Sequence, residues 1–85
     1  MEYSISRFEK ILNEDTSVKE IFISVRLNKN TDTWEQGYWL TEEEKNLVVI
    51  DEMNLGAIVD RVAIIGEAAL DTYKALPPID PDQIN

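Results

Sequence analysis

The feature that most constrains this chain is one long helical period near its C-terminal end. From about residue 54 to residue 76, apolar side chains recur at 3.6 residues per turn and therefore share one side of a helix. They are Leu55, Ile58, Val59, Val62, Ile65, Ala69, Tyr73 and Leu76. Pro77 and Pro78 end the pattern, because proline cannot continue a helix. A helix of about 22 residues is about 33 Å long, enough to cross a small sheet.

Two strands are predicted before this helix. Residues 18–27 alternate between apolar and polar side chains, which is the period of a half-buried strand. The apolar face carries Ile21, Ile23, Val25 and Leu27. Residues 28–32 are rich in Asn and Asp, which suit a turn, and residues 33–40 alternate again. We therefore expect a β-hairpin, with Trp34 and Tyr38 on one face of its second strand and Trp39 on the other.

A short helix is predicted at about residues 5–14. Ile5, Phe8, Ile11 and Leu12 have helical spacing, with charged residues between them. Residues 6–9 read Ser-Arg-Phe-Glu, which fits a capping box at a helix start. We expect one apolar face on this helix.

Residues 41–53 give conflicting signals. The sequence Thr-Glu-Glu-Glu at 41–44 is a capping box, whereas Leu-Val-Val-Ile at 47–50 is a β-branched run of strand length. We expect a turn and then a third strand at about 46–51, and a separate helix from 42 to 53 is the alternative. The predicted fold class is α+β in the order α-β-β-β-α. A three-stranded antiparallel meander would pack against the long C-terminal helix and the short N-terminal helix, forming one domain over 1–76 with an extended or disordered tail at 77–85.

The residue types that are absent argue against an enzyme. The 85-residue chain has no cysteine and no histidine, which excludes His-based and Cys-based nucleophiles and the usual zinc ligands. Only three glycines occur, and none forms a phosphate-binding loop. Two carboxylates would need a cleft, and so short a chain has little material for its walls. We expect a non-catalytic protein without a cofactor or metal.

The segments that direct a chain to or through a membrane are not found. The N-terminus has no basic region followed by an apolar run, and the apolar stretch at 62–70 is broken by Gly66 and Glu67. We expect a cytoplasmic location.

The net charge limits the kinds of partner that the chain can bind. The net charge is −9, of which −7 falls within residues 41–85. Such a field repels nucleic acid and anionic membranes and attracts basic surfaces. The leading hypothesis is an acidic protein-binding module that docks on a basic protein surface, possible roles being inhibitor or nucleic-acid mimic. In size and charge it is similar to small anti-restriction, anti-CRISPR, antitoxin and nuclease-immunity proteins. The candidate partner-binding residues are Glu42, Glu43, Glu44, Asp51, Glu52, Asp60, Glu67 and Asp71.

Three of these acids form a stripe on the long helix. Asp60, Glu67 and Asp71 lie within about 40° of one another, opposite the apolar face. Three carboxylates are too sparse to imitate a nucleic-acid backbone, and the simpler interpretation is an ordinary solvated helix face. Mimicry therefore requires the acids of residues 42–44 and 51–52 to lie beside the stripe.

A second line on the same helix suggests self-association. It consists of Ala57, Ile64, Ala68 and Ala75, whose small side chains would let another helix approach closely. A small domain without disulfides gains from association. The alternative function is thus a homodimeric or larger structural or accessory domain whose acidity serves only solubility.

Overall fold

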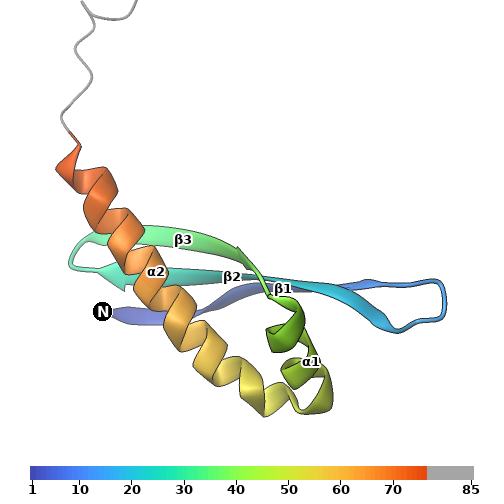
Figure 1. Ribbon diagram of the computed structural model, residues 1–85. Coiled ribbons are helices and arrows are strands. Elements are labelled where there is room, and N and C mark those ends of the chain that lie inside the picture. The colour runs from blue at the N-terminus through green and yellow to red at the C-terminus, as the bar shows by residue number, and fades with distance from the viewer. Residues whose placement is uncertain (77–85) are drawn as a thin grey trace, which may run out of the picture.

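Three strands followed by two helices make up the computed structural model, which describes residues 1–76 (Figure 1). In chain order the elements are β1 (Glu2–Leu12), β2 (Val18–Lys29), β3 (Asp32–Trp39), α1 (Glu42–Ile50), the short 3-10 helix η1 (Glu52–Asn54) and α2 (Leu55–Ala75). The α+β class, the antiparallel sheet and the long C-terminal helix are as predicted. The tail predicted at 77–85 concerns residues outside those described.

The sheet is an antiparallel meander in the order β1-β2-β3. The predicted hairpin is confirmed, because β2 pairs with β3 in continuous register from Phe22–Trp39 to Lys29–Asp32. Asn30 takes a positive φ of 58° in the turn, a conformation that Asn tolerates better than most residues. The strand order makes β1 and β3 the two edges of the sheet.

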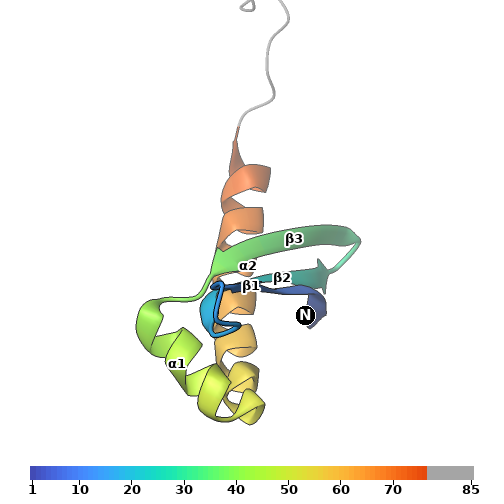
Figure 2. The same cartoon turned by 90° about the vertical axis from the view of Figure 1, so that its right-hand side faces the viewer.

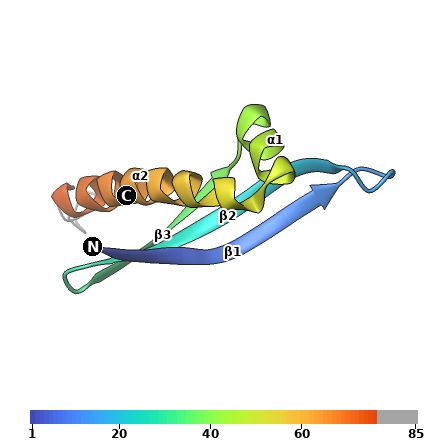
Figure 3. The ribbon, with the colours of Figure 1, turned by 90° about the horizontal axis from the view of Figure 1, so that it is seen from below.

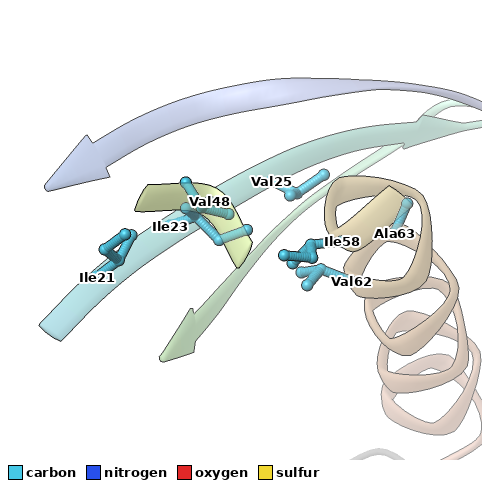
Figure 4. Packing of buried hydrophobic residues seen from close by; sticks show 7 residues of the cluster. All are labelled: Ile21, Ile23, Val25, Val48, Ile58, Val62 and Ala63. Atoms are coloured by element: carbon cyan, nitrogen blue, oxygen red, sulfur yellow. The ribbon is translucent and has the colours of Figure 1, made fainter. Parts of the chain in front are cut away.

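The core lies between β2 and the helices, on one face of the sheet. Alternate residues of β2, from Ile21 to Leu27, are fully buried on this face. Val48 of α1 and Ile58, Val62 and Ala63 of α2 pack against them (Figure 4). Figure 2 shows α2 crossing the strands steeply instead of running along them.

The predicted N-terminal helix is wrong, because residues 2–12 form β1. The register of β1 on β2 slips by one residue between Ile5 and Arg7, which marks a β-bulge at Ser6. The extra residue turns a spacing of two into a spacing of three, so Ile5 and Phe8 lie on the same face of a strand. A bulged strand thus imitates the spacing of a helix.

Ser6, which the sequence predicted to be part of a capping box, instead stabilises the bulge with its side chain. The Ser6 hydroxyl donates to the Glu35 carboxylate of β3 at 2.5 Å and to the Ser24 carbonyl of β2 at 3.2 Å. The hydrogen bond from Ser6, with Arg26 nearby, lowers the pKa of Glu35. The Ser6 side chain therefore ties all three strands together on the face opposite the helices.

At residues 42–50 the expected third strand is wrong and the alternative, a helix, is right. Thr41 is the N-cap of α1 and forms a complete capping box with Glu44. Only Val48 of the apolar run is fully buried, while Val49 and Ile50 are exposed. The complete capping box and the three acids of the first turn therefore outweigh the β propensity of the apolar run.

Candidate protein-binding surface

Glu44 is the one predicted partner-binding acid that is buried, with 8% of its surface exposed. Its carboxylate accepts hydrogen bonds from the Tyr38 hydroxyl and from the backbone N–H of Thr41, both at 2.8 Å. The Arg61 guanidinium of α2 lies against the other carboxylate oxygen. Glu44 thus connects β3, α1 and α2, and its carboxylate is occupied by intramolecular contacts.

This arrangement predicts unequal effects at two neighbouring glutamates. We expect Glu44→Ala to lower the free energy of unfolding by about 2–3 kcal/mol, because it leaves the Tyr38 hydroxyl and Thr41 N–H unsatisfied and unpairs Arg61. Glu43→Ala, one residue away at an exposed position, is the matched control and should stay within about 0.5 kcal/mol. Urea titration of both variants checks this, and similar losses at the two positions would contradict it.

The remaining acids of α1 and η1 are exposed. Glu42 pairs with Lys45 at 2.7 Å, and Glu43 lines a shallow depression of about 380 Å³ with Tyr38, Arg61 and three others. Asp51 caps η1 by accepting from the Met53 N–H. Glu52 pairs with Lys10 of β1 at 3.3 Å.

The acid stripe of α2 lies on the side that faces β1 and the end of β2. Asp60 accepts a hydrogen bond of 2.7 Å from the Tyr3 hydroxyl, which raises the pKa of that hydroxyl. Lys29 lies between the other two, 3.4 Å from Glu67 and 3.0 Å from Asp71. The hydrogen bond to Asp71 is the main contact that raises the pKa of Lys29. Asp60 differs from the other stripe acids in that its partner is neutral.

The eight predicted acids do not come together on one surface. Those of residues 42–44 lie beside Tyr38 of β3, at one edge of the sheet. Glu52 and Asp60 contact Lys10 and Tyr3 of β1, at the other edge, whereas Glu67 and Asp71 contact Lys29 at the hairpin end of the middle strand β2. The acids that nucleic-acid mimicry requires side by side thus contact different strands of the sheet, and Glu44 among them is buried.

The predicted self-association line is exposed along its length. Ala57, Ile64, Ala68 and Ala75 all lie on the outer side of α2, and Ile64 is 65% exposed. None belongs to the buried core. The position of this line is as expected, and dimerisation through it stays a prediction.

A surface that the sequence did not indicate lies along β1. Tyr3, Ile5 and Phe8 pair with buried residues of β2, so their side chains point to the helix-bearing face. They nevertheless remain 40%, 38% and 37% exposed, because α2 passes over β2 and β3 and covers little of β1. Figure 3 shows β1 along the edge of the sheet that lies away from α1. We call the row Tyr3, Ile5, Phe8 the β1 strip.

Two polar contacts bound the β1 strip on its helix side. The Tyr3 hydroxyl meets Asp60 at one end, and Lys10 meets Glu52 beyond the other end. Ile5 and Phe8 lie between them and are exposed although they face the core layer. The strip is thus an apolar surface bordered by acids. Its signal in the sequence, alternation at Tyr3 and Ile5, is interrupted by the bulge.

The opposite face of the sheet carries no helix within residues 1–76. Phe22 and Trp39 pack there with ring centroids 5.0 Å apart, and the Arg7 guanidinium lies 5.8 Å from the Phe22 ring centre. Trp39 is about half exposed and lies on the face opposite Trp34 and Tyr38, as predicted. Arg7, Arg26 and Glu35 surround the pair, so this face mixes aromatic and charged groups.

The search for other kinds of site gave negative results over the described residues. Within 1–76, no three acids converge in a way that would hold a metal ion. No helix in the same range is both long enough and apolar enough to span a bilayer.

Comparison with known proteins leaves the surface to be interpreted on its own geometry. The chain matches no known protein-family model, no curated protein and no solved structure.

Proposed function

We propose that this chain is a non-catalytic, acidic module that binds a basic partner protein through the β1 strip and the acids beside it. The observation that carries the proposal is the half-exposure of Tyr3, Ile5 and Phe8 on the core-facing side of an edge strand. A row of large apolar side chains at the border of the core is typical of a surface that a partner covers.

Charge indicates what kind of partner this is. The net charge of −9 attracts basic surfaces over a distance and disfavours acidic ones. Close to the strip, the Asp60 carboxylate accepts a hydrogen bond from the Tyr3 hydroxyl and forms no ion pair with any residue of the range 1–76. Apolar contact would supply most of the affinity, and the acids would supply the association rate and the selection of partner.

The division of the acids favours docking over nucleic-acid mimicry. Mimicry needs regularly spaced charges on one continuous surface, whereas the acids here contact different strands of the sheet and Glu44 is buried. Inhibition of a nucleic-acid-binding protein stays compatible with this proposal, provided that the contact is apolar at its centre.

The experiment is affinity capture from the native host with the purified chain as bait, followed by measurement of the dissociation constant for each captured protein. We expect Phe8→Ser to weaken binding of the true partner by about tenfold or more, because truncation of a central aromatic anchor costs about 2 kcal/mol. Raising NaCl from about 0.05 to about 0.5 M should weaken it as well.

The control is Trp39→Ser, which removes a more exposed aromatic from the other edge strand and the other face. It should leave the affinity within about twofold. Thermal unfolding of both variants checks that they remain folded. Binding that is insensitive to Phe8→Ser, or that strengthens with salt, contradicts the proposal.

The second candidate is the homo-oligomeric domain expected from the sequence. The exposed Ile64 among the exposed alanines of α2 is the observation that favours it. Light scattering of the purified chain distinguishes the two, because the binding module is a monomer in the absence of its partner.

A further inference from the structure

We propose that the partner binds by strand addition: an extended segment with apolar and basic side chains pairs with the free edge of β1 as a fourth strand. This inference rests on the proposed function and specifies how the same surface binds. It follows from the backbone of β1, from the side chains that the added strand would meet, and from the charges near them.

The direction in which the N–H and C=O groups of β1 point follows from one hydrogen bond at the other edge of the sheet. The Leu40 N–H donates to the Ile21 carbonyl at 3.0 Å, so the peptide groups of Ile21 point towards β3. The N–H and C=O groups of successive residues in a strand point to opposite sides, so the N–H and C=O of Phe22 point towards β1, where Phe22 is paired with Glu9. The peptide groups of Phe8 and Lys10 must therefore point outwards, away from β2.

The same alternation beyond the bulge makes the groups of Tyr3 and Ile5 point outwards too. No strand lies beyond β1 among the described residues. The free edge is 11 residues long and has no proline, although short edge strands and prolines are the usual protections against pairing. The residues whose backbone faces outwards are also those whose side chains form the β1 strip.

An added strand would complete the cover of this strip. Side chains on its helix-facing side would lie beside Ile5 and Phe8, at about 5 Å in the sheet direction. Apolar side chains there would bury the exposed parts of both residues. A lysine or arginine near the Tyr3 end would meet Asp60, whose contact in the described part of the chain is the neutral Tyr3 hydroxyl.

A second copy of the chain is a less suitable occupant. Pairing β1 with β1 of another copy would place two α2 helices on the same face, flanking the new strand pair. The two chains would each bring a net charge of −9 to the contact. A basic segment gains from these charges, whereas a second copy is repelled by them.

The closing experiment uses a defined probe, a peptide of about eight residues alternating lysine and valine, which spans the strip from Tyr3 to Lys10 at about 3.3 Å per residue. Hydrogen exchange of the full chain is followed by NMR with and without the peptide. We expect the outward amides of Tyr3, Ile5, Phe8 and Lys10 to exchange fast in the free chain and at least tenfold more slowly with bound peptide. A peptide with glutamate in place of lysine should give no protection.

Two variants at one position separate backbone pairing from side-chain contact. Lys10→Pro and Lys10→Ala both lose the ion pair with Glu52, but only the proline removes the outward N–H. Proline is compatible with an edge strand when its N–H faces away from the neighbour, and Glu9 before it is already extended. We expect Lys10→Pro to bind the peptide at least tenfold more weakly than Lys10→Ala, with similar melting temperatures.

Each other result overturns strand addition. Peptide binding without protection of the four amides, or with equal affinity for the two Lys10 variants, means docking through side chains alone and leaves the proposed function intact. Absence of peptide binding rejects strand addition while the affinity capture still tests the proposed function. If exchange of the four amides slows as the protein concentration rises, without any peptide, a second copy of the chain occupies the edge of β1. If Lys10→Pro does not fold, exchange in the unsubstituted chain decides.

Discussion

Ile23→Ala is expected to destabilise the chain by about 3–4 kcal/mol. Ile23 is fully buried at the centre of β2, with Phe8 and Tyr38 as its cross-strand neighbours and the helices above. Truncation removes the apolar surface of three carbons and leaves a cavity, which costs about 2–5 kcal/mol for buried isoleucine. A single core in so small a domain rarely supplies more than about 3–5 kcal/mol of stability, so this variant should keep little of the original stability.

The matched control is Ile64→Ala, the same substitution on the exposed side of α2, where 65% of the residue is accessible. It should change stability by no more than about 0.5 kcal/mol, because alanine is the better helix former and little burial is lost. Urea titration followed by far-UV circular dichroism measures both. A loss at Ile64 as large as that at Ile23 would indicate that the outer side of α2 is buried in an oligomer.

Gly66→Ile is expected to destabilise the chain by about 3 kcal/mol. Gly66 is the point of closest approach between α2 and the sheet: a Cβ there would lie 2.6 Å from Leu27 Cδ2 and 3.1 Å from Gln36 Cβ. Leu27 is fully buried in the core. Isoleucine adds further atoms in the same direction, so α2 must move away from β2, and overpacking of this kind costs about 1–3 kcal/mol or more.

Gly56→Ala is the matched control for Gly66→Ile. Nothing lies within 4 Å of a Cβ at Gly56, which is exposed in the first turn of α2. The added methyl group raises helix propensity, and we expect a gain of about 0.5 kcal/mol. Thermal unfolding of the two variants should shift in opposite directions. A small effect of Gly66→Ile would mean that α2 is not held against Leu27.

These two positions also bear on the proposed binding surface. Gly66 lets α2 approach β2 and β3 closely, and the helix then covers β2 while β1 remains partly exposed. The β1 strip thus results from the position of one helix on a three-stranded sheet. A helix centred over β1 would have buried Ile5 and Phe8 and left no apolar row at the edge.

Much of the fold is readable from local periodicity. The alternation in residues 18–27 and 33–40 predicts the hairpin, because each side chain in a strand faces opposite to the next. The apolar side of residues 54–76 predicts α2, and the capping box at Thr41 correctly indicates a helix start. The prediction failed at residues 2–12, where the bulge at Ser6 changes the period from two to three.

The candidate surface was only partly foreseeable. The acidic charge was evident, but the contacts of Asp60 and Glu52 with β1 were not, and neither was the burial of Glu44, since its contacts with Tyr38 and Arg61 join three elements. Ile5 and Phe8 were recognised as apolar residues of one face. Their half-exposure depends on which neighbour covers them, and no local pattern contains that information.

The sequence by itself determined the elements with a regular period, the helix caps, the absence of cysteine and histidine, and the net charge of −9, because each is a local or summed property of the residues. Only the tertiary structure decided that the N-terminal segment is an edge strand, that the acids contact different strands of the sheet, and that an apolar row on β1 is left partly uncovered. These depend on contacts between residues far apart in the chain, chiefly the close approach of α2 to β2 at Gly66.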